Sequence, residues 1–242
     1  PGKFEGYEFS SDERYVLLQT NPHQIYRHSF TAKFEVYDTQ TKSKVLLFDG
    51  KGIQEPLFSP DASKVAFAFE NNLYIQDLKS NKVTQVTTDG KKNNIINGIN
   101  DWVYEEEFQA TRHFAWSPDS KLLAFLKFNE TEIPEFSFQL FKNESQIDTD
   151  INLYPSFLKF KYPKAGENNA KVSVCVYDDF NKTTKFMQLP ESDQDYYIPR
   201  IRWTNTADQL AIFKLNRNQN RLDMLSANPK STLSKLILRQ ED

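Results

Sequence analysis

The chain is short of several residue types, and each shortage excludes something. One cysteine occurs among the 242 residues, so an internal disulfide framework is excluded. The net charge is −3 and no basic stripe occurs, which argues against a nucleic-acid partner. No apolar stretch approaches the roughly 20 residues that a membrane-spanning helix needs. We therefore expect neither nucleic-acid binding nor a membrane span in this segment.

Glycine is scarce as well, with seven in the chain. None of them flanks a serine in the Gly-x-Ser-x-Gly arrangement that forms the nucleophile elbow of α/β-hydrolases. The sequence also lacks a long βαβ region from which a hydrolase sheet is built. We expect this chain to contain no catalytic residue of a serine hydrolase.

Histidine occurs three times and cysteine once, and none of these residues stands in a pattern typical of catalysis. His28 is expected to pack or hydrogen-bond beside its neighbours. His23 and His113 are expected at the surface or in turns. Cys175 lies in an alternating run of strand-forming residues, 171–177, which predicts a small buried hydrophobe rather than a reactive thiol.

Aromatic residues, by contrast, make up 14% of the chain and favour strands over helices. One unit recurs: an aromatic residue, a turn related to Ser-Pro-Asp, and an apolar strand. Its copies are residues 9–18, 58–67, 116–125 and, in degenerate form, 203–212. Repeats of about 40–50 residues with four short strands are typical of propeller blades. The sequence predicts an all-β fold, a partial β-propeller of several four-stranded blades, whose later blades carry insertions.

The insertion before the third copy contains the run Asn-Asp-Trp-Val-Tyr-Glu-Glu-Glu-Phe, residues 100–108. Its three consecutive glutamates are framed by apolar and aromatic residues, which predicts a short helical segment anchored against a core. Two adjacent, partly desolvated carboxylates form a receptor for a cation such as an ammonium group. The alternative is a surface helix whose glutamates face water. Inserted loops on a rigid frame commonly carry function, which favours the receptor.

Residues 97–107 resemble the glutamate motif of the dipeptidyl peptidase IV family. Three further stretches agree in order and rough spacing: 26–32, 128–134 and 162–168. The resemblance extends from about residue 19 to residue 223. It implies an eight-bladed propeller followed by an α/β-hydrolase domain, and an enzyme that removes N-terminal dipeptides with proline or alanine second.

The resemblance also implies roles for individual residues. Glu106 and Glu107, the second and third acids, would bind the free α-ammonium of the substrate, and Arg27 would reach a substrate carbonyl oxygen. Without the resemblance, Arg27 would be interpreted as a strand-edge ion pair. Supporting residues are expected around the acids: Asp101 and Trp102 to cap and pin the helix, Tyr104 to anchor it, and His28 beside Arg27.

For the domain organisation, we expect residues 1–242 to form an incomplete N-terminal propeller without the C-terminal hydrolase domain. Eight blades of roughly 42 residues would need about 340 residues. The parent is expected to be a serine peptidase that acts on peptides with a free N-terminus, needs no cofactor or metal, and forms a homodimer. A periplasmic or exported bacterial protein is favoured, with a cytoplasmic location left open.

Three other functions remain open at this point. In the first alternative, the chain belongs to a catalytically inactive relative that works as a protein-interaction module. In the second, it belongs to an unrelated binding propeller whose glutamate run is structural. The matches at Arg27 and at residues 162–166 argue against the unrelated propeller. A glycosidase is weaker still, because adjacent residues hardly flank a sugar bond at the ~5–10 Å separation of its two carboxylates.

Overall fold

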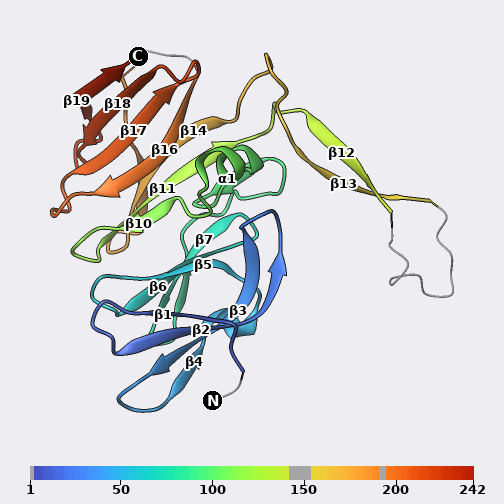
Figure 1. Ribbon diagram of the computed structural model, residues 1–242. Helices are drawn as coiled ribbons and strands as arrows, with labels where there is room; N and C mark the ends of the chain where they lie inside the picture. The colour runs from blue at the N-terminus through green and yellow to red at the C-terminus, as the bar shows by residue number, and fades with distance from the viewer. Residues whose placement is uncertain (1–2, 142–153, 191–194) are drawn as a thin grey trace.

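The computed structural model describes residues 3–141, 154–190 and 195–242, whose regular secondary structure is almost entirely β-strand (Figure 1). The first sheet contains β1 (Gly6–Phe9), β2 (Tyr15–Gln24), β3 (Phe30–Asp38) and β4 (Lys44–Leu46). The second contains β5 (Gln54–Phe58), β6 (Lys64–Phe69), β7 (Asn72–Asp77) and β8 (Val83–Gln85). A 3₁₀ turn, η1 (Leu47–Gly50), links the two.

The third sheet contains β10 (Phe114–Trp116), β11 (Leu122–Asn129), β14 (Lys171–Asp178) and β15 (Thr183–Phe186), with β9 (Ile95–Asn97) paired to β11. The fourth contains β16 (Tyr196–Trp203), β17 (Leu210–Asn216), β18 (Arg221–Ala227) and β19 (Ser234–Glu241). Each four-strand path is an antiparallel meander, and the sheets follow one another around the molecule (Figure 1). The predicted all-β, partial propeller is confirmed.

The recurring sequence unit forms the turn between the first two strands of each blade. In the second blade, the Ser59 hydroxyl donates to Asp61 Oδ1 at 2.6 Å and accepts from the Lys64 N–H at 3.0 Å. Ala62 adopts a left-handed backbone with φ of 55° inside this turn. The same Ser-to-Asp bond recurs at Ser117 and Asp119. Short polar side chains thus satisfy the turn backbone, and the strands on either side are paired in register.

Burial is concentrated between neighbouring sheets. One core cluster joins the first and second blades through residues such as Leu17, Val36 and Phe67, and a larger one joins the second, third and fourth. Cys175 in β14 is fully buried, and burial raises the pKa of its thiol to about 12. The prediction of a small, buried side chain in a strand is confirmed for Cys175.

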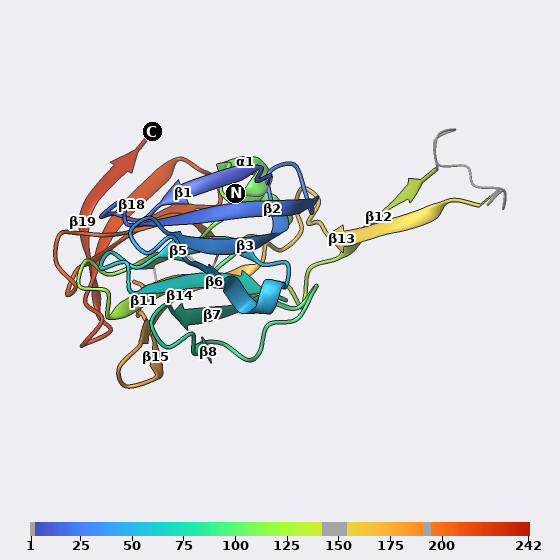
Figure 2. The ribbon, with the colours of Figure 1, turned by 90° about the horizontal axis from the view of Figure 1, so that it is seen from below.

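Two insertions interrupt the blades. The helix α1 (Trp102–Phe108), which the glutamate run predicted, is inserted between β9 and β10. A hairpin of β12 (Glu135–Leu140) and β13 (Ser156–Lys161) is inserted between β11 and β14. Both ribbon views show this hairpin projecting away from the blades as an arm (Figures 1 and 2). The described residues include no helix with the length and apolarity to cross a bilayer.

Candidate functional site

The helix α1 is short, and its ends are fixed by local backbone chemistry. The Tyr104 N–H donates to Asp101 Oδ1 at 2.9 Å, so Asp101 is the N-cap. Such a cap contributes about 0.5–2 kcal/mol. Gln109 ends the helix in a left-handed conformation with φ of 50°. Complete burial raises the pKa of the Asp101 carboxyl to about 6, while the capping bond opposes that rise.

Two aromatic side chains anchor α1 to different parts of the molecule. Tyr104 is buried, its ring packs edge-on against Phe128 at 4.8 Å, and its hydroxyl accepts from the Ile198 N–H of β16 at 2.8 Å. The Trp102 ring lies 4.7 Å from Tyr162 and 5.7 Å from Phe160 at the base of the arm, measured between centroids. The helix is therefore held by the fourth blade on one side and by the arm on the other.

The three consecutive glutamates have three different environments. Glu105 is 1% exposed and accepts the N–H groups of His28 and Ser29 at 2.6 and 2.9 Å. Glu106 is partly exposed and Glu107 is exposed. The first acid therefore fastens the segment around residue 28 to the helix, while the second and third remain available at the surface. The His28 side chain itself is exposed, and its contribution to this junction is its backbone N–H.

The structure brings Arg27 to Glu106, although 79 positions separate them in sequence. Arg27 Nε donates to both carboxylate oxygens of Glu106, at 3.0 and 3.2 Å, while its side chain remains 70% exposed. The two terminal guanidinium nitrogens make no hydrogen bond within the described residues. An exposed pair of this kind contributes only about 0–1 kcal/mol to stability. Its consequence is positional, since it places a guanidinium whose terminal nitrogens are unbonded within the described residues beside the partly exposed Glu106.

A further buried acid lies near this site that sequence reasoning did not single out. Glu130 is 5% exposed, and burial, reinforced by the charge of Asp101 and opposed by Lys161, raises the pKa of its carboxyl to about 8. The pKa of the nearby Tyr26 hydroxyl is also raised, to about 12. Burial is the main cause, and the negative charges of Glu130, Asp101 and Glu105 add to it. The Glu130 carboxyl therefore holds its proton more strongly than an ordinary glutamate does. In the sequence, the feature that could have pointed to Glu130 is its position within residues 128–134, one of the stretches that resemble the peptidase family.

The expectation for His113 is wrong. It is 4% exposed and packs edge-on against Tyr104 at a centroid distance of 5.6 Å. Burial, with the nearby charge of Arg200, lowers the pKa of its imidazole to about 4. The reason is that the segment after α1 turns back beneath the helix, where the His113 N–H donates to the Gly98 carbonyl at 2.7 Å and its carbonyl accepts from the Leu126 N–H at 2.9 Å.

Comparison with known proteins agrees with this architecture. Residues 10–242 match the family described as the dipeptidyl peptidase IV (DPP IV) N-terminal region. The crystal structure of Porphyromonas gingivalis dipeptidyl peptidase 4 is similar with a TM-score of 0.92 and 40% identity, covering 99% of this chain and 33% of that one.

Two curated relatives extend the comparison. Prolyl endopeptidase FAP of Bos taurus is 33% identical over 221 residues, which cover 88% of this chain and 28% of the relative. Dipeptidyl-aminopeptidase B of Aspergillus niger is 34% identical over 232 residues, which cover 92% and 25%. The chain thus spans between a quarter and a third of the length of these relatives. It belongs to the dipeptidyl peptidase IV family and corresponds to part of that family's N-terminal, propeller-forming region.

Proposed function

We propose that this chain is the substrate-binding propeller segment of a serine dipeptidyl peptidase that removes N-terminal X-Pro or X-Ala dipeptides. Glu106 and Glu107 bind the α-ammonium of the peptide. The observation that carries the proposal is the difference between the three acids of α1. Glu105 is turned inward onto two backbone N–H groups, which docks the helix and leaves Glu106 partly exposed and Glu107 exposed. The nucleophile and its base belong to an α/β-hydrolase domain outside residues 1–242.

The chemistry of the site follows from its donors and acceptors. An ammonium group has three N–H donors and no acceptor, so two carboxylates take two of them and a further acceptor takes the third. Arg27 is fixed through Nε, and its terminal nitrogens donate to a substrate carbonyl oxygen. When the free amine of a peptide is bound at a fixed place, its position determines which peptide bond reaches the nucleophile. Cleavage after the second residue follows from the distance between the ammonium site and the nucleophile.

The test is an activity assay on the complete parent protein. A chromogenic Gly-Pro amide is compared with the same amide carrying an acetylated N-terminus, because acetylation removes the ammonium and leaves the scissile bond intact. We expect cleavage of the free-amine substrate and at least a hundredfold lower kcat/KM for the blocked one. Equal cleavage of both would refute the role of the glutamate pair. Cleavage of neither by folded protein would instead identify an inactive relative that acts as an interaction module.

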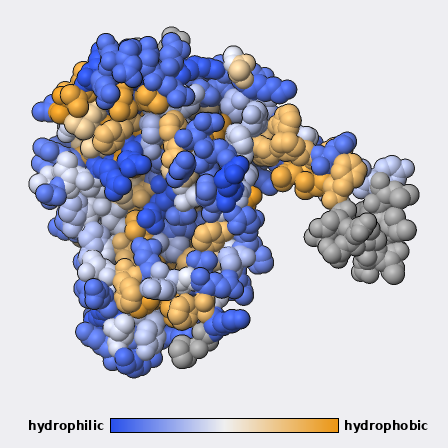
Figure 3. Space-filling view, in the orientation of Figure 1, coloured by the Kyte–Doolittle hydropathy of each residue, from blue (hydrophilic) through white to orange (hydrophobic). Residues whose placement is uncertain are grey.

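We propose further that the parent is a homodimer to which the β12–β13 arm contributes. Strand register places Phe136, Phe138 and Leu140 on one face of the arm, opposite Phe160, Leu158 and Ser156. Phe138, Leu140 and Leu158 are each more than 40% exposed, and Figure 3 shows hydrophobic residues along the arm. The opposite face is more polar, with Glu135, Ser137 and Lys159, although it also carries the exposed Phe157. One apolar face on a projecting hairpin is typical of a protein contact.

Sedimentation of the full parent measures this contact. We expect Phe138→Ser combined with Leu158→Ser to shift the dimer to monomer, since both changes place a hydroxyl in the apolar face. Lys159→Ser on the other face is the matched control and should leave the dimer intact. A monomeric wild-type protein, or a double variant that stays dimeric, would show that the arm is not the contact.

A further inference from the structure

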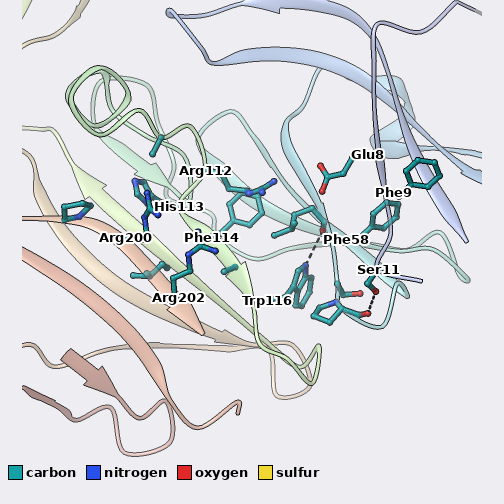
Figure 4. A pocket seen from close by; sticks show the side chains of 17 residues that line it. Glu8, Phe9, Ser11, Phe58, Arg112, His113, Phe114, Trp116, Arg200 and Arg202 are labelled. Carbon is teal, nitrogen blue, oxygen red and sulfur yellow. Dashed lines mark hydrogen bonds between the residues drawn. The ribbon is translucent and has the colours of Figure 1, made fainter. Parts of the chain in front are cut away.

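The first strands of the four blades line a common pocket of about 570 Å³ (Figure 4). Its walls come from β1, β5, β10 and β16 and from residues 110–113, the segment that follows α1. The innermost strands of successive blades therefore face one shared space, and the end of the glutamate helix leads directly into its wall. Neither Glu106 nor Glu107 lines this pocket.

The pocket is cationic. Three arginines line it, Arg112, Arg200 and Arg202, against a single acidic residue, Glu8. Arg112 lies 3.9 Å from Glu55, which is outside the lining. Arg200 and Arg202 are exposed and have no ion-pair partner among the described residues. Figure 4 shows Arg200 and Arg202 on β16 at one side of the pocket and Glu8 on β1 at the other.

A buried polar atom without a partner lies in the same wall. His113 is 4% exposed, and its Nε2 makes no hydrogen bond in the described structure. Burial, with the charge of Arg200 second, holds the pKa of this imidazole near 4, so the ring is neutral at physiological pH. A neutral imidazole carries one N–H donor, and Figure 4 places the ring on the Arg200 side of the pocket. Either ring nitrogen can carry that N–H, so Nε2 is a buried polar atom of this wall that has no partner in the described structure.

The rest of the lining is apolar. Phe58, Phe114, Trp116 and Pro199 line the pocket alongside the three guanidinium groups. Inorganic anions gain nothing from such walls, whereas an organic carboxylate attached to an apolar residue matches both halves of the lining. The planar fork of a guanidinium fits a carboxylate with two parallel hydrogen bonds.

We propose that this pocket binds the terminal carboxylate of a peptide, with Arg200 and Arg202 as its main cationic groups, His113 as a further polar group of the wall, and the aromatic residues against the last side chain. That the carboxylate belongs to a peptide rests on the proposed function, since a dipeptidyl peptidase takes peptides and releases a dipeptide that carries a new carboxylate. The pocket and its charge are independent of that function.

The experiment is a calorimetric titration of the full parent protein with N-acetyl-Gly-Pro, whose carboxylate is free and whose amine is blocked. The matched probe is N-acetyl-Gly-Pro amide, which lacks the carboxylate. We expect the acid to bind at least tenfold more tightly than the amide. Arg200→Gln combined with Arg202→Gln should remove that preference, whereas Lys121→Gln combined with Lys235→Gln, which removes two charges outside the pocket, should leave it intact.

Glu106→Gln combined with Glu107→Gln separates this site from the ammonium site. The blocked probe has no ammonium, so its affinity should be unchanged in that variant, even if the variant and the wild type prove equally active and the proposed function fails. Equal binding of acid and amide, or an unaltered preference in the double arginine variant, would overturn the carboxylate site. Displacement of the probe by inorganic phosphate at equal or lower concentration would overturn its assignment to a peptide.

Discussion

Replacing Glu106 and Glu107 together by glutamine is expected to abolish turnover of free-amine substrates by the parent enzyme without unfolding it. The amide side chains keep the shape of the carboxylates and lose both charges, so the ammonium of the substrate would be desolvated without a compensating anion. Breaking a desolvated ion pair costs about 3–5 kcal/mol, so kcat/KM should fall by about two to four orders of magnitude. The measurement is kcat/KM on a Gly-Pro amide, with thermal denaturation in parallel.

The exposure of the two acids explains why the double glutamine variant should keep its thermal stability. Glu107 is exposed and Glu106 pairs with an arginine that is 70% exposed, so neither acid has a large share in holding α1. The double variant should therefore keep the Tm of the wild type to within a few degrees. Undiminished activity would remove the pair from the substrate site. A collapse in Tm would show instead that the surface acids have a structural role that their exposure does not suggest.

Much of this architecture was visible in the sequence because it depends on short-range chemistry. The turn of the recurring unit satisfies its own backbone within about five residues, so its four copies, two of them Ser-Pro-Asp, could be recognised without knowledge of the rest of the chain. The short helix was also predictable, since Asp101 caps it three residues before a buried tyrosine. The resemblance to the peptidase family added Arg27, whose partner lies 79 positions away and which no local pattern could have connected to Glu106.

The environments of individual side chains were harder to predict. Three identical glutamates in a row give no indication of which one turns inward, because successive helical residues point about 100° apart and the docking of α1 decides the outcome. His113 was misplaced for a related reason: its burial depends on the segment after α1 folding back between Gly98 and Leu126. Glu130 is another case, since burial and the nearby charge of Asp101, neither of which a local pattern reveals, raise the pKa of its carboxyl to about 8.

The inward-facing acid, Glu105, leads to the second large effect. Replacing it by alanine should loosen the junction between α1 and the Arg27 segment and lower both stability and activity. Its carboxylate is the acceptor for the N–H groups of His28 and Ser29, and Ser29 is itself buried. Removing a partner from a buried donor costs about 1–3 kcal/mol, so two donors and a small cavity predict a loss of roughly 3 kcal/mol in local stability. Arg27 would lose its fixed backbone, and under the proposed function kcat/KM should fall although Glu105 itself is turned inward.

Amide hydrogen exchange in the parent protein measures this effect directly, because a local loss should speed exchange in residues 26–32 far more than elsewhere. Glu105→Gln retains one acceptor oxygen and should restore part of the protection, whereas a purely electrostatic role would give the same result for glutamine and alanine. Glu107→Ala on the same helix is the matched control, since that side chain is exposed and should leave exchange unchanged. If exchange in residues 26–32 is unaltered in Glu105→Ala, the first acid does not hold the arginine in place, and the rigidity of the ammonium site must come from the anchors Trp102 and Tyr104 alone.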